Sequence, residues 1–186
     1  LGKDPYIDIK GSPFFYEFFS DCYIQLNNGE SYIGPKIKFN LTNQKLHYQG
    51  ANSQELVLQD GIIKRFNFNV PFKNESISYT FACGYPPIAG NTINTFYQEF
   101  NVGTATLLRF ISKKVVEHKA TANINPFKEF MEVSTYYISS SRYNKVEKWR
   151  KGKDFILDFL SDKRGLVEKF IADNNLSCKS PEDIII

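Results

Sequence analysis

The chain has few of the residues on which metal and redox chemistry depend. Its 186 residues include 3 cysteines and 2 histidines. Zinc sites need closely spaced Cys or His ligands, but Cys22, Cys83 and Cys178 are far apart and form no Cys-x-x-Cys pair. We therefore expect no metal site. Three free thiols are favoured over one disulfide with a leftover thiol, and the sequence does not show which two cysteines would pair.

Long hydrophobic runs and an excess of one charge are also missing. No stretch approaches the roughly 20 apolar residues that a membrane-spanning helix requires. The 23 basic and 20 acidic residues give a net charge of +3. This charge is too small and too evenly spread to predict binding to nucleic acid or to an anionic membrane. A chain of this length is most simply a single domain with its own core.

Recognisable catalytic signatures are absent from the sequence as well. It contains no Gly-x-Ser-x-Gly elbow, no phosphate-binding loop and no dinucleotide-binding glycine motif. His47 lies in a predicted strand opposite its apolar neighbours and His118 lies in a charged run, so we expect both to face solvent rather than act as a base. Asp60, Glu99 and Asp154 are isolated acids, and no pair stands out for acid–base catalysis. We expect no enzymatic activity and no cofactor.

Aromatic residues, by contrast, are abundant. They make up 16% of the chain, with 17 Phe and 11 Tyr. Rings on this scale fill the space between layers of structure, and they also line cavities for apolar ligands. Filling of the core is the more common role, and the composition alone leaves both roles open.

Residues 94–117 carry the clearest structural signal. Val, Ile, Thr, Phe and Tyr crowd this stretch, which is typical of half-buried strands. It predicts a hairpin of Phe96–Asn101 and Thr104–Glu117, with Val102–Gly103 as the turn. The earlier segments look like shorter versions of this hairpin.

Turn signals such as Asn28–Gly29 and Asp60–Gly61 recur about every ten residues between stretches of alternating polarity. Helical runs between the strands, which a parallel sheet needs, are missing. The pattern therefore predicts an antiparallel meander that is curved or barrel-like. For residues 14–19 a short helix or turn is favoured over entry into a strand. The other predicted strands are Asp21–Leu26, Tyr32–Asn40, Lys45–Gln49, Leu56–Leu58, Ile62–Val70, Ile77–Cys83, Met131–Ser139 and Arg142–Trp149.

The periodicity changes after residue 150. Apolar residues at positions i, i+1, i+4 and i+5 in Asp154–Leu160, and again in Lys163–Asn174, predict two amphipathic helices. Ser180–Pro181 is typical of the start of a third helix. We predict a mainly β (α+β) protein, with an antiparallel β domain at residues 1–150. A helical tail of two to three short helices, residues 151–186, packs on the sheet within a single structural domain.

Basic residues alternate with aromatic ones in the stretch Arg142–Lys153. Proteins that bind single-stranded nucleic acid combine basic grooves with stacking rings, and Tyr143 or Trp149 would supply the rings here. Glu147 interrupts the pattern, however, and the charge of the whole chain is nearly balanced. We favour a charged edge strand with Trp149 anchoring the helices, and we expect no nucleic-acid partner.

A resemblance to a known family is carried by three stretches. They are the opening GSPFFYEFF, the strand–glycine–strand unit around Gly103, and the C-terminal KDFILDFLSDKRGLVEKFIADNNLSCKSPEDI. Together they resemble a family of uncharacterised exported proteins from Bacteroidetes-type bacteria. Because a signal peptide or lipoprotein signal usually comes first in that family, the resemblance implies an extracytoplasmic location, in the periplasm or at the cell surface. The start at Leu1–Gly2, without Met, fits a trimmed or mature form. The resemblance implies no catalytic residues.

Two functional hypotheses follow. In the first, the protein binds an apolar or amphiphilic ligand, and residues 14–19 and the loop Gly84–Gly90 form the mouth of the site. Its ligand-binding residues would be Phe14, Phe15, Phe18, Tyr85 and Phe96. In the second, the sheet is filled and the protein is a structural or protein-interaction module of the cell envelope. An interior volume of several hundred cubic ångströms favours the first hypothesis, and continuous side-chain contact favours the second.

Overall fold

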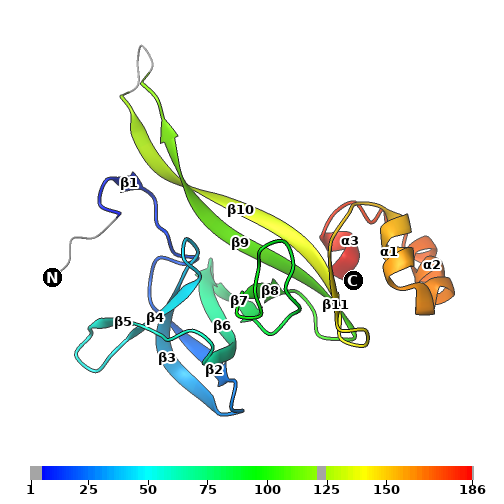
Figure 1. Cartoon of the computed structure of the whole chain (residues 1–186), viewed down its shortest axis with the longest axis horizontal. Helices are drawn as coiled ribbons and strands as arrows, with labels where there is room; N and C mark the ends of the chain where they lie inside the picture. Colours follow the sequence, from blue (N-terminus) through cyan, green and yellow to red (C-terminus); the bar gives the residue numbers. More distant parts are fainter. Residues whose placement is uncertain (1–5, 121–124, 186) are drawn as a thin grey trace.

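The computed structural model describes residues 6–120 and 125–185, and these form one large sheet followed by short helices (Figure 1). The sheet has 11 strands in the order β1-β10-β9-β8-β7-β6-β2-β3-β4-β5, with β11 paired to β10. All the pairings are antiparallel except that of β1 with β10. The strands are β1 (Ile9–Lys10), β2 (Ser20–Leu26), β3 (Ser31–Asn40), β4 (Lys45–Gln49), β5 (Glu55–Val57), β6 (Ile63–Phe72), β7 (Glu75–Ala82), β8 (Tyr97–Glu99), β9 (Ala105–His118), β10 (Phe127–Ser140) and β11 (Lys145–Lys148).

The mainly β fold with C-terminal helices is confirmed, but the strand order differs from a simple meander in two places: β1 pairs with β10 instead of β2, and the order changes again between β5 and β6. Consecutive strands pair from β2 to β5 and from β6 to β11, whereas β6 pairs with β2 instead of β5. The pairing of β2 with β6 places Cys22 opposite Phe68, and Ile24 opposite Phe66. The apolar face of β2 thereby joins the apolar face of β6. The sheet ends at β5 and does not close into a barrel.

Strands β9 and β10 form a long ribbon that connects the N-terminal strands with the helices (Figure 1). They pair at 14 consecutive positions, from Phe127 with His118 to Ser140 with Ala105. The predicted turn at Val102–Gly103 is in fact part of a wider loop. The side chain of Asn101 holds this loop, because its amide nitrogen donates to the Ala105 carbonyl at 2.8 Å and its oxygen accepts from the Leu107 amide at 2.9 Å.

The segment before β2 is joined to the sheet at two points. Strand β1 pairs with β10 through Ile9 and Lys128. For residues 14–19 the prediction is a short helix or turn; Phe14 makes an isolated antiparallel bridge with Asn40, and residues 15–18 form bends. They are fastened to β3 because the Phe15 amide donates to the Phe39 carbonyl at 2.8 Å. Strand β10 begins at Phe127, four residues before the predicted start at Met131.

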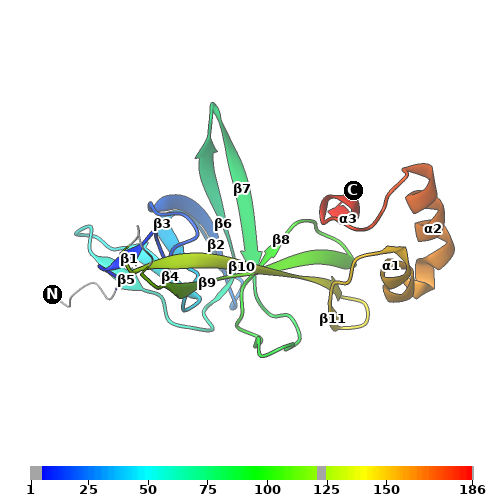
Figure 2. The ribbon, with the colours of Figure 1, turned by 90° about the horizontal axis from the view of Figure 1, so that it is seen from above.

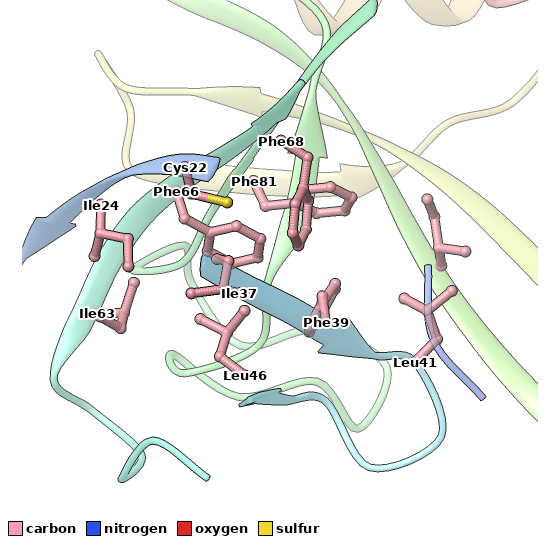
Figure 3. Packing of buried hydrophobic residues seen from close by; sticks show 11 residues of the cluster. Cys22, Ile24, Ile37, Phe39, Leu41, Leu46, Ile63, Phe66, Phe68 and Phe81 are labelled. Carbon is pink, nitrogen blue, oxygen red and sulfur yellow. The ribbon is translucent and has the colours of Figure 1, made fainter. Parts of the chain in front are cut away.

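Phenylalanine side chains fill the first core, between the β2–β4 strands and the β6–β7 hairpin (Figure 3). Phe39, Phe66, Phe68 and Phe81 are each at most 1% exposed. The Phe66 and Phe81 rings stack with their centroids 5.2 Å apart, and Phe39 meets Phe66 edge-on at 5.3 Å. Because Phe66 and Phe68 are two positions apart on one strand, they point to the same face of the sheet. The aromatic richness of this region is therefore used for packing.

The helical tail builds a second core at the other end of the ribbon (Figure 2). It comprises α1 (Lys153–Phe159), a 3-10 turn (Ser161–Lys163), α2 (Arg164–Asp173) and α3 (Glu182–Ile185). Trp149 packs against this core, with its ring centroid 5.9 Å from that of Tyr136 on β10, which confirms its expected anchoring position. Ser180 caps α3 through the Asp183 amide at 3.4 Å. In the described part of the chain, no helix is long and apolar enough to cross a membrane.

Candidate ligand-binding pocket

Two of the five sequence-predicted ligand residues are part of the aromatic core. Phe15 lies 4.9 Å from Tyr79 and 5.1 Å from Phe81 between ring centroids. Phe96 lies 5.0 Å from Phe66 and also meets Phe39 edge-on. Both rings contact other side chains of the filled sheet, so the structure gives them a packing role.

Phe14 and Phe18 lie apart from that core. Phe14 lines a recess of about 550 Å³ with mixed polar and apolar walls, where the Lys38 ammonium lies 4.1 Å above its ring. Phe18 is 65% exposed and contacts Tyr16. The structure therefore does not bring the two residues into a common site with Phe15 and Phe96.

Tyr85, the fifth predicted residue, fastens its loop to the sheet. Its hydroxyl donates to the Glu99 carboxylate, which also pairs with Arg65 at 2.9 Å. The Glu99 side chain is 6% exposed. Burial raises the pKa of Tyr85, and the hydrogen bond to the Glu99 carboxylate raises it further. Tyr85 is thus a neutral donor that stabilises a buried ion pair.

The histidines differ in exposure. The His47 side chain is 14% exposed, so the expectation that it faces solvent is wrong. Its Nδ1 lies 2.6 Å from the Glu55 carboxylate, which also accepts from Lys38 at 2.9 Å. Burial raises the pKa of Glu55, but hydrogen bonds from Lys38 and His47 outweigh this effect and lower it overall. The His118 side chain is 41% exposed and lies 2.7 Å from Glu129.

The helical tail encloses an apolar pocket that sequence analysis did not find. Its volume is about 370 Å³. It lies between the three helices and the end of the β9–β10 ribbon nearest to them. The residues around it are mostly aliphatic: Asn101, Ala105, Thr106, Leu107, Ile138, Ile156, Leu160, Leu166, Val167, Phe170, Ile171, Leu176, Cys178, Asp183 and Ile184.

The ribbon and the helices contribute to this pocket for reasons that are visible in the sequence. Leu107 and Ile138 are direct partners across β9 and β10, so their side chains lie together on one face, and both are at most 4% exposed. On α2, Val167, Phe170 and Ile171 are spaced by three and four residues and therefore share one side of the helix. Phe170 is 44% exposed and Leu166 69% exposed. These two side chains form an apolar rim between the pocket and solvent.

Polar groups at the pocket are few. Asn101 uses its side-chain amide to hold the β8–β9 loop. The Cys178 thiol is free and buried, and burial raises its pKa. Asp183 is the one charged residue among the described residues that line the pocket. Its carboxylate accepts hydrogen bonds from the Ser177 hydroxyl and from the Lys179 amide, and these bonds lower its pKa.

Within residues 6–120 and 125–185, no three His, Cys, Asp or Glu side chains are placed to hold a metal ion.

The chain matches no family model, no curated protein and no solved structure. The geometry of the pocket is therefore the basis for an argument about function.

Proposed function

We propose that the protein binds an amphiphilic molecule with a single aliphatic chain in the pocket beneath its helical tail. The supporting observation is the open apolar volume of about 370 Å³, in a molecule whose sheet core is filled. Ligand pockets range from about 300 to 1,000 Å³, and this one is near the lower limit. That size favours one chain over a bulky fused-ring ligand. An extracytoplasmic location stays a prediction that rests on the family resemblance.

The expected source of affinity is the transfer of the chain out of water. Each buried methylene contributes about 0.8 kcal/mol, which corresponds to roughly fourfold in affinity. Leu107, Ile138 and Ile171 supply buried aliphatic contact surface. The exposed rim of Leu166 and Phe170 supplies an apolar path between solvent and pocket.

Calorimetric titration with a series of primary alcohols, from 1-hexanol to 1-dodecanol, tests this proposal. We expect saturable binding of one alcohol per chain, with affinity rising roughly fourfold per methylene until the pocket is full and then levelling off. Adsorption to exposed apolar patches would not saturate at one molecule per chain. If no alcohol in the series binds at one per chain, the proposal is wrong, and the interaction-module hypothesis becomes the better account of this fold.

A pair of matched variants locates the binding. Val167→Trp fills the pocket, and Val115→Trp adds the same ring to an exposed position, 43% accessible, on β9. We expect the first variant to abolish binding of 1-decanol and the second to leave it unchanged. Unchanged binding of 1-decanol to Val167→Trp would place the alcohol elsewhere. Circular dichroism of both proteins checks that the fold is retained.

A further inference from the structure

We propose that the ligand carries a cationic head group, a primary ammonium, and that Asp183 binds this group at the pocket wall. The inference rests on the proposed function, because it names the head of the amphiphile whose chain occupies the pocket. It follows from the position and hydrogen bonding of one carboxylate.

Asp183 is held in place by hydrogen bonds from its neighbours. It lies in the first turn of α3 and lines the pocket together with Ile184. The Ser177 hydroxyl and the Lys179 amide both donate to its Oδ2 atom. In the described part of the chain the carboxylate has no ion-pair partner, although ten other pairs are present there. A fixed carboxylate without a counter-ion beside an apolar pocket is complementary to a cation attached to an aliphatic chain.

The remainder of the pocket opposes an anionic head. Among the described residues that line it, there is no Lys, Arg or His. The carboxylate of a fatty acid would therefore meet a like charge at Asp183 without a compensating cation. Burial and the charge of Asp183 raise the pKa of Cys178, and the charge of Lys153, at the start of α1, only partly opposes this rise; Lys153 does not line the pocket. Lys153→Gln therefore serves as a control that removes a nearby charge without changing a residue that lines the pocket.

Three ligands share a ten-carbon chain and differ only in the head group: decylamine, 1-decanol and decanoate. Their affinities therefore show what the head group contributes to binding. At pH 7 an alkylammonium is protonated and a carboxylate is ionised. We expect decylamine to bind about threefold more tightly than 1-decanol, and decanoate about threefold more weakly, as for a solvent-accessible charge pair. Both differences should shrink in 1 M NaCl, where the screening length falls to roughly 3 Å.

Asp183→Asn removes the charge and keeps the size of the side chain and an oxygen that accepts hydrogen bonds. We expect the affinity ratio of decylamine to decanoate to fall from about tenfold to near one. The control Asp154→Asn alters a carboxylate of α1 that does not line the pocket, and it should preserve the ratio. Lys153→Gln should preserve the preference for the amine as well.

The outcomes distinguish this inference from the proposed function. If 1-decanol binds but decylamine is no tighter, the cationic head is wrong and the pocket remains an aliphatic-chain site. If decylamine is preferred and Asp183→Asn leaves that preference intact, the assignment of Asp183 is overturned. If none of the three ligands binds, both proposals fail.

Discussion

The two apolar cores that contact the β9–β10 ribbon use their residues in opposite ways. In the sheet core, Phe39, Phe66, Phe68 and Phe81 meet ring to ring and are at most 1% exposed. In the helical tail, aliphatic side chains of three short helices surround an open volume of about 370 Å³. The large rings of the sheet core interlock, whereas the three short helices leave a gap against one another and against the ribbon. The comparison predicts that stability comes mainly from the sheet, and it is the reason why we place the proposed binding site in the tail.

The largest expected effect on stability comes from a substitution in the aromatic core of the sheet. Phe66→Ala should reduce the free energy of unfolding by about 3–5 kcal/mol, because it removes a ring from a core that contacts it on several sides. Chemical denaturation monitored by circular dichroism measures this loss. The matched variant Phe18→Ala, at a position that is 65% exposed, should change stability by less than about 0.5 kcal/mol. Similar losses in the two variants would mean that the sheet core is not the main source of stability.

A smaller effect should come from adding volume instead of removing it. Ile37 of β3 is fully buried, so Ile37→Phe should overpack the sheet core and cost about 1–3 kcal/mol. Val167→Phe points a larger side chain into the pocket, where there is room, and should cost less than about 1 kcal/mol. The difference in unfolding free energy between the two variants measures the openness of the tail directly. If Val167→Phe is as destabilising as Ile37→Phe, the tail is as tightly packed as the sheet.

Local patterns in the sequence predicted most of the elements that the structure contains. Alternating residues and turn signals located the strands, as at Lys45–Gln49, where β4 has the predicted bounds. The helical stripes located α1 and α2. The pairing of β6 with β2 was not predictable in this way, because two strands of similar alternation fit either neighbour. That choice depends on how Cys22 and Phe68 pack across the sheet.

The candidate site was harder to predict than the fold. The abundance of phenylalanine suggested an aromatic pocket lining near Phe14 and Phe96. In the structure, the Phe96 ring packs against Phe39 and Phe66 instead and helps to fill the sheet core. The actual pocket depends on distances between helices, and the stripe of Val167, Phe170 and Ile171 indicates only that one side of α2 is apolar. His47 shows a similar limit. Its strand position was correct, yet the carboxylate that it contacts comes from Glu55 on the next strand.

The smallest expected effect is the pH dependence of stability that comes from Glu55 of β5, which contacts Lys38 of β3 and His47 of β4. The pKa of Glu55 is lower in the folded protein than its ordinary value of 4.5. The carboxylate therefore contributes stability above that value, and this contribution is lost as the pH falls through the lower, folded pKa. Because the Glu55 side chain is 40% exposed, the change should be small. Glu55→Gln should flatten the dependence of melting temperature on pH below about 4.5, whereas Glu30→Gln, at an exposed turn, should leave it unaltered.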